Sequence, residues 1–257
     1  MALFESGNPT LSQKFFDRSR AIQAEQQGVM SVRGTMNKFG FVLLMLIGGA
    51  AYNWHLYETS NQGMMSTLMM VGLFGGLIIG FAIIFKPNWA QYLAPAYGIL
   101  EGLLLGGLSA IINDQFKAKY PGLVTQAVGL TFGVAASMFL LYNFRVIRAT
   151  QKLRSIIFVA TAGIAIFYLI DILLFYIFKI DIPITSWENS SLISIGFSLF
   201  VITIAALNLI MDFDMIERGA DMGAPKFMEW YGAFGLMITI VWLYIEILKL
   251  LTRFSRR

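Results

Sequence analysis

The chain has 257 residues, of which 57% are hydrophobic and only 13% are charged, and its formal net charge is +4. A soluble domain carries roughly 25% charged residues, so this composition excludes an ordinary soluble protein and predicts one that crosses a membrane several times. The sequence has no Cys and one His, His55, which excludes disulfides, thiolate metal sites and poly-histidine metal centres. The basic residues flank apolar segments, so the positive charge indicates membrane topology and not nucleic-acid binding.

In chain order, the sequence begins with residues 1–38, which predict a polar, cytoplasmic N-terminal tail, and continues with a membrane domain over 39–257. A helix needs about 20 apolar residues to cross a bilayer, and only helices fit long continuous apolar runs in lipid. Seven segments have that length, near 39–55, 63–85, 93–112, 123–143, 155–178, 190–212 and 229–251. We therefore expect an all-α integral membrane protein, a bundle of seven transmembrane helices.

The basic residues set the expected orientation. With the N-terminus inside, twelve Lys and Arg lie on the inner side and seven on the outer side, which favours a cytoplasmic N-terminus and an external C-terminus. Four of the seven outer residues, Lys249, Arg253, Arg256 and Arg257, crowd the C-terminal end and oppose this orientation. A last segment that re-enters the membrane without crossing it is the open alternative.

Two stripes of glycine recur every four residues in neighbouring segments. They are Gly72, Gly76 and Gly80 in the second segment, and Gly98, Gly102 and Gly106 in the third. Small residues at this spacing let helix backbones approach closely in a bilayer, where no hydrophobic effect drives helices together. We expect both segments to pack tightly against neighbours.

Five carboxylates lie within or at the end of apolar segments, where charged side chains are costly and usually mark a pathway or a paired site. At about 1.5 Å per helical residue, Glu101, Asp212 and Asp214 fall in a layer near the inner face. Asp171 and Glu246 fall about 24 Å deep, in an outer layer. Carboxylates that approach in a low dielectric titrate as a unit, and a calcium ion relieves the same repulsion through its oxygen ligands. The acids therefore form a candidate pH-sensing cation pathway.

Each acid also has a structural interpretation, which the sequence leaves open. Asp212 and Asp214 lie close enough to Arg218 to be interfacial ion-pair residues, and Glu101 could bond to a hydroxyl such as that of Ser109. The two outer acids could be neutral, hydrogen-bonded packing groups.

Several stretches together resemble the Bax inhibitor-1-like family, also called the transmembrane BAX inhibitor motif family, in its bacterial form. They are VMSVRGTMNK from Val29 to Lys38, APAYGILEG from Ala94 to Gly102, PGLVTQA from Pro121 to Ala127, the DFD of Asp212 to Asp214, EWY at Glu229, and WLYIE from Trp242 to Glu246. The resemblance implies a seven-helix bundle with six helices around a central one, and a place in a bacterial inner membrane. It also implies a pH-sensitive calcium leak in some members and protease-regulating or cytoprotective roles in others.

The family's pH-sensing pair is an Asp at the end of the sixth helix and an Asp in the seventh. Asp212 matches the first, but the second position falls near Thr239, with Glu246 two helical turns further on. The family also latches its first Asp with an Arg, where Lys86 is the nearest residue here. The resemblance thus makes Lys86 the candidate counter-charge. Asp212 and Glu101, as oxygen ligands of the inner layer, are the candidate calcium ligands.

The sequence favours a non-enzymatic function without a cofactor, because it has no phosphate-binding glycine loop and no His-Glu-x-x-His motif. Two functions remain. The first is a pH-sensitive cation leak, with calcium as the permeant ion, gated by the buried carboxylates. The second is an interaction protein that binds a membrane protease or another membrane protein, with the N-terminal tail as its contact segment.

Overall fold

The computed structural model describes residues 28–257, and the tail residues 1–27 lie outside it. Seven helices in the described part are long and apolar enough to cross a membrane. They are α2 (Val32–Glu58), α3 (Gln62–Phe85), α4 (Ala90–Phe116, preceded by the short η2, Pro87–Trp89), α5 (Leu123–Asn143), α6 (Gln151–Leu173, extended by the π-helix η3, Leu174–Phe178), α7 (Leu192–Asp221) and α8 (Met228–Ser255). The predicted all-α, seven-helix membrane fold is confirmed.

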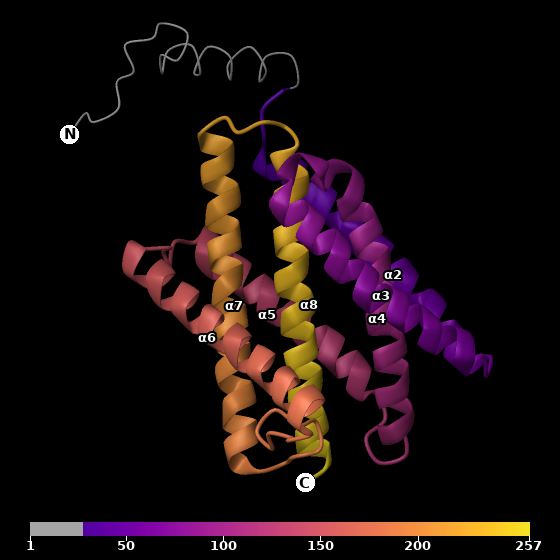
Figure 1. Ribbon diagram of the computed structural model, residues 1–257. Helices are drawn as coiled ribbons and strands as arrows, with labels where there is room; N and C mark the ends of the chain where they lie inside the picture. Colours follow the sequence, from indigo (N-terminus) through magenta and orange to yellow (C-terminus); the bar gives the residue numbers. More distant parts are fainter. Residues whose placement is uncertain (1–27) are drawn as a thin grey trace, which may run out of the picture.

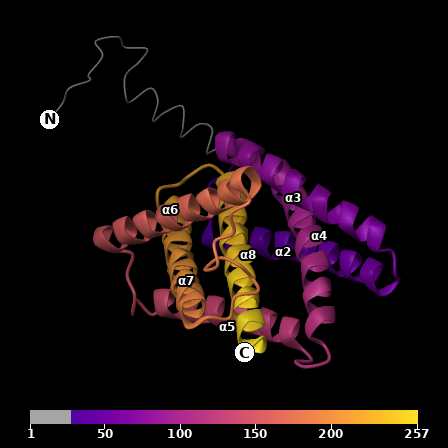
Figure 2. The ribbon, with the colours of Figure 1, turned by 60° about the horizontal axis from the view of Figure 1, so that its bottom comes forward.

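Helix α8 is the centre of the bundle. It packs against α2, α4, α5 and α7, while α6 lies on the outer side of α7 and α3 on the outer side of α4. Figure 2 shows α8 in the middle, with α6 and α7 to one side and α2, α3 and α4 to the other. About half of the apolar span of α4, α7 and α8 is buried, against about a tenth of α6, so the outer helices present most of their hydrophobic side chains to lipid.

The predicted helix ends differ from the observed ones in two places that matter for the site. Helix α2 begins at Val32, within the predicted tail, because the Ser31 hydroxyl accepts a hydrogen bond from the Gly34 N–H and caps the first turn. Helix α7 continues for nine residues past the predicted end at residue 212 and reaches Asp221. Asp212 and Asp214 therefore lie inside a helix and not at its end.

The helix packing reduces the conflict in the charge count. Lys249 and Arg253 are buried inside the fold, with 5% and 0% of their surface exposed, so they are not loop charges and do not enter the rule that cytoplasmic loops are positive. Helix α8 runs the length of the bundle, and Figure 1 places the chain near residue 28 and the C-terminus at opposite ends. The geometry therefore fits seven full crossings, and which end is cytoplasmic stays a prediction.

The two glycine stripes serve different interfaces. A Cβ atom added to Gly72 would lie 2.5 Å from the Leu100 carbonyl oxygen, so the stripe on α3 faces α4. A Cβ added to Gly102 would lie 2.1 Å from the Leu46 carbonyl oxygen, so the stripe on α4 faces α2. Of the other stripe members, Gly98 and Gly106 contact the α2 backbone, while Gly76 and Gly80 face side chains of α4. Helix α4 is thus held between α2 and α3 at backbone contact.

Candidate functional site

Asp212 of α7 faces α8, where Thr239 is its hydrogen-bond partner. The Thr239 hydroxyl donates to the carboxylate of Asp212 over 2.6 Å, and it also lies 3.3 Å from the Gly235 carbonyl oxygen. Thr239 is 7% exposed, and Asp212 is partly accessible. Thr239, at the position where the family pattern has a second acid, therefore binds Asp212 directly. A carboxylate–hydroxyl pair replaces the expected pair of carboxylates.

Asp214, two residues further along α7, is in a different electrostatic environment. Arg218 of the same helix and Arg154 at the start of α6 both form ion pairs with its carboxylate, the second at 3.0 Å. The nearby Glu217 pairs with Arg145. Two arginines thus balance the charge of one buried acid, which agrees with the structural interpretation of Asp214. The pair with Arg154 fastens the end of α7 to α6.

Glu101 and Lys86 do not join Asp212 in the described part of the chain. The Glu101 carboxylate faces α3, where a Cβ added to Gly76 would lie 3.1 Å from its Oε1 atom. The Lys86 ammonium lies 4.4 Å from the centroid of the Trp89 ring, and no ion pair among residues 28–257 joins it to Asp212. The physical reason is that Lys86 ends α3, a helix that packs on α4 and not on α7. The expected Lys86 latch is absent from this arrangement, and the partner of Asp212 is the neutral Thr239.

Glu246 lies seven residues after Thr239, about 10 Å further along α8. Its carboxylate is 3% exposed and accepts a hydrogen bond from the Tyr168 hydroxyl of α6 over 2.7 Å, while its second oxygen has no hydrogen-bond partner among residues 28–257. A buried carboxylate oxygen without a partner is energetically costly, so it indicates either a functional role or a bound water, proton or ion at this oxygen.

The outer layer also contains buried cations that the sequence analysis counted only as flanking charges. The Lys249 ammonium lies 5.1 Å from the Tyr168 ring centroid and within electrostatic reach of both Glu246 and Asp171. Arg253, one helical turn further, donates to the Ser198 hydroxyl and to three carbonyl oxygens on the segment 184–194. Lys249 thus lies near both outer acids without an ion pair to either among residues 28–257, and the arginine ties the end of α8 to the loop before α7.

Glu229 is a buried acid that the sequence analysis quoted only as a motif. It is 0% exposed and forms ion pairs with Lys38 and with Lys226, the second at 2.9 Å. The Ser31 N–H and hydroxyl both donate to it over 2.9 Å. The motif around Lys38 and the motif at Glu229 therefore form one contact between the first turns of α2 and α8. The signal in the sequence was an acid at the start of an apolar span, with a lysine three residues before it.

No group of three or more His, Cys, Asp or Glu side chains that could hold a metal ion occurs in residues 28–257. Asp212 and Glu101 are therefore not part of a common ligand set in this conformation. What the fold does provide is two acids about two helical turns apart along the central-helix interface: Asp212 against Thr239, and Glu246 against Tyr168.

The fold and these intramembrane acids define a polytopic α-helical membrane protein with carboxylates along its central helix. The chain belongs to the Bax inhibitor 1 like family, whose model matches residues 8–256. A glycerol-3-phosphate acyltransferase of Streptococcus gordonii is 27% identical to it over 172 residues, which cover 65% of this chain and 76% of that protein. No solved structure matches the chain.

Proposed function

We propose that this protein is a pH-sensitive leak pathway for cations, with calcium as the permeant ion, in a bacterial inner membrane. The observation that carries the proposal is the set of partners around the Asp212 carboxylate. Among residues 28–257 its carboxylate has one hydrogen-bond donor, Thr239, and no cationic partner, whereas Asp214 nearby has two arginines. An acid within a membrane segment that is not neutralised by a cation is a site for a proton or a metal cation.

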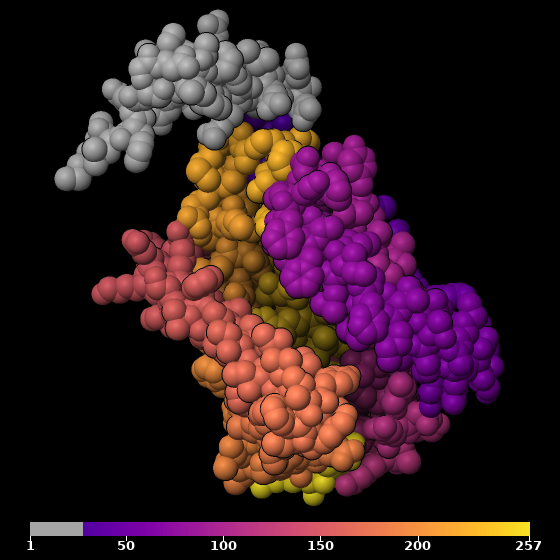
Figure 3. Space-filling model, in the orientation of Figure 1, coloured from indigo at the N-terminus to yellow at the C-terminus, as the bar shows by residue number. Residues whose placement is uncertain are grey.

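Glu246 offers a second acidic site, which supports a continuous cation path over a single isolated site. Glu246 lies on α8 two turns beyond Thr239 and has one carboxylate oxygen without a protein partner among the described residues. Figure 3 shows α8 at the bottom of a hollow between α6 and α3, so the central helix is accessible from that face. A cation that passes Asp212 would next meet Glu246, with Lys249 beside it as a charge that limits cation occupancy.

Protonation of Asp212 is the proposed gating step. The ionised carboxylate accepts a charge-assisted hydrogen bond from Thr239, which is stronger than one between neutral groups, and it holds α7 against α8. A proton removes the charge, weakens that bond and lets the two helices separate. Acid therefore opens the path, and alkaline pH closes it.

Calcium flux into liposomes that contain the purified protein tests this proposal. We expect the wild-type flux to rise as the pH falls from 8 to 6. Asp212→Asn, which removes the ionisable group at nearly constant shape, should give the acid-state flux at both pH values. Asp214→Asn is the matched control on the same helix and should keep the pH dependence. If wild type and Asp212→Asn respond alike to pH, Asp212 is not the sensor; if wild type gives no flux at any pH, the leak itself is excluded.

The second candidate is the interaction protein that restrains a membrane protease. Its expected contact segment, the N-terminal tail, lies mostly outside the described residues. The chain without residues 1–27 tests it: a leak pathway should keep its flux, and an interaction protein should lose its effect on the protease.

We propose further that the chain is not an enzyme. The acyltransferase likeness gives the direct test, because the purified protein should not acylate glycerol 3-phosphate. Acylation of glycerol 3-phosphate by the wild-type protein, with an acyl donor supplied and above a protein-free control, would contradict this proposal.

A further inference from the structure

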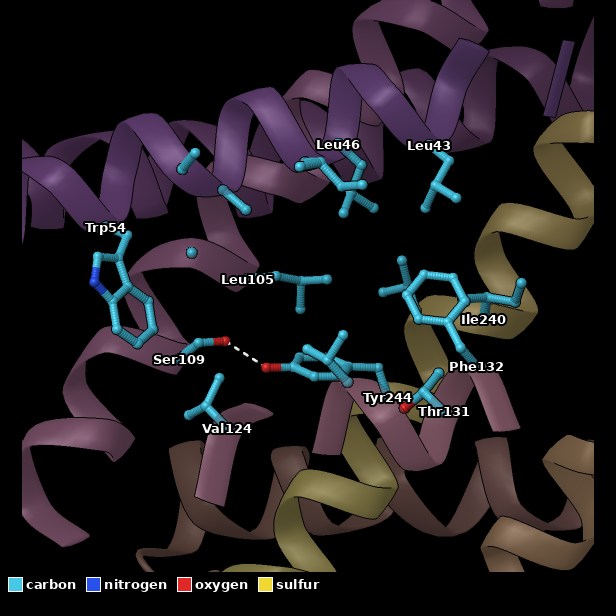
Figure 4. Close-up of a pocket in the computed structure, with 16 residues that line it drawn as sticks. Leu43, Leu46, Trp54, Leu105, Ser109, Val124, Thr131, Phe132, Ile240 and Tyr244 are labelled. Carbon is cyan, nitrogen blue, oxygen red and sulfur yellow. Dashed lines mark hydrogen bonds between the residues drawn. The ribbon is translucent and has the colours of Figure 1, made fainter. Parts of the chain in front are cut away.

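A long apolar cavity lies between α2, α4, α5 and α8, away from the acids of the proposed pathway. Its volume is about 390 Å³, within the size range of small-molecule sites. Figure 4 shows it with Leu43 and Leu46 on one wall, Leu105 and Ser109 on another, and Tyr244 from the central helix. At its rim lie Ile47 of α2 and Phe132 of α5, which are 48% and 42% exposed, so the cavity opens to the lipid-facing surface between these helices.

Each hydroxyl group in the cavity walls already has a hydrogen-bond partner within the protein. The Ser109 and Tyr244 hydroxyls form a hydrogen bond with each other over 2.6 Å, and the Thr131 hydroxyl donates to the Ala127 carbonyl oxygen. The remaining lining is aliphatic or aromatic. A hydrocarbon is the ligand that such walls favour, because it supplies dispersion contacts and requires no hydrogen bond.

The shape of the cavity fits one hydrocarbon chain. Its lining on α2 runs from Leu43 to Trp54, a separation of eleven helical steps and therefore about 16 Å along the helix. The volume divided by this length gives a mean cross-section of about 24 Å², or about 5 Å in each direction, and carbon atoms in contact are about 3.5–4 Å apart. An extended acyl chain therefore fits along the cavity.

A second, polar pocket adjoins the cavity at its Trp54 end. Trp54 lines both, and the polar pocket adds Glu58 of α2 with Asp114 and Lys117 near the end of α4. The Trp54 indole N–H donates to Glu58 over 2.8 Å, and Lys117 pairs with Asp114. Two carboxylates face one ammonium, and both α2 and α4 end here, where a helix carries partial negative charge. The pocket therefore favours a cationic group.

We infer that this composite site binds one phospholipid with an ammonium headgroup, of which phosphatidylethanolamine is the common form. One acyl chain lies in the apolar cavity, the interfacial Trp54 marks the boundary, and the ammonium group meets Glu58 and Asp114. Because α2, α4, α5 and α8 all line the site, a bound lipid would link the central helix to three of its neighbours. The site is separate from Asp212 and Glu246.

Native mass spectrometry of the full chain in detergent, with phosphatidylethanolamine or phosphatidylglycerol of identical acyl chains added, tests the inference. We expect phosphatidylethanolamine adducts on the wild type. Ala51→Phe and Val128→Phe, which fill the cavity from opposite walls, should lower their occupancy about tenfold. Ala136→Phe on the exposed side of α5 does not line the cavity and should leave it unchanged. Wild-type occupancy in both cavity variants would overturn the acyl-chain site.

Two further measurements test the inference without the cavity-filling variants. Equal binding of phosphatidylglycerol and phosphatidylethanolamine would overturn the headgroup assignment, and Glu58→Gln with Asp114→Asn should remove the preference for the ammonium lipid. In detergent, one equivalent of phosphatidylethanolamine with a brominated acyl chain should quench the tryptophan fluorescence of the wild type more than that of Trp54→Phe. Equal fractional quenching in both would contradict a chain beside Trp54.

Discussion

The Thr239 hydroxyl of α8 donates to the Asp212 carboxylate of α7 across 2.6 Å, and this bond joins the central helix to the helix that carries the candidate pH sensor. A neutral threonine in this position holds the acid without neutralising it. The threonine is therefore as important to the proposed gate as the aspartate.

Thr239→Val should remove the donor at nearly constant volume. A hydrogen bond to a charged group contributes about 1.5–3 kcal/mol, so its loss should shift the closed-to-open population about tenfold or more. We expect the calcium flux of Thr239→Val in liposomes to be high at pH 8 and to change little down to pH 6. Thr239→Ser, which keeps the hydroxyl, should behave as the wild type. A closed Thr239→Val protein at pH 8 would show that this bond does not hold the gate.

Gly102→Leu should destabilise the bundle, because the first added atom would lie 2.1 Å from the Leu46 carbonyl oxygen and would force α2 and α4 apart. Overpacking typically costs about 1–3 kcal/mol, and more where backbone must move. A fall in the thermal unfolding temperature in detergent measures the effect. Gly133→Leu on α5, where an added Cβ meets nothing within 4 Å, is the matched control and should not lower that temperature. Similar melting of both variants would argue against the close approach.

Glu229→Gln should loosen the contact between α2 and α8. The substitution keeps the shape of a fully buried side chain but removes the charge that pairs with Lys38 and Lys226, and charged hydrogen bonds of this kind contribute about 1.5–3 kcal/mol. Faster protease cleavage near residue 28, together with a lower melting temperature, would report the loosening. Glu188→Gln, an exposed acid in the loop before α7, should change neither. An unchanged cleavage rate in Glu229→Gln would mean that other contacts hold the start of α2.

The absence of cysteine from the sequence makes topology measurable with single-cysteine variants. We expect Val146→Cys, in the exposed segment between α5 and α6, to react with an impermeant maleimide only from the cytoplasmic side. Glu188→Cys and Arg257→Cys should react only from outside. Labelling of Arg257→Cys from the cytoplasmic side would contradict an external C-terminus.

The sequence by itself determined the membrane class, the number of helices and the family. The reason is physical: in lipid every backbone polar group must be bonded internally, so each apolar run of spanning length becomes a helix. The glycine stripes likewise predicted close packing, since a missing side chain is a local property. The family motifs were readable because their residues are contiguous.

Only the tertiary structure decided which partner each acid has. Asp212 and Asp214 are two residues apart, yet one faces a threonine of α8 and the other two arginines, one of them on α6. Glu101 turns to α3, and Lys249 and Arg253 turn into the core although the charge count placed them outside. Sequence spacing gives depth along a helix, but the rotation of each helix about its axis is set by packing against its neighbours, and that rotation determines which charges meet.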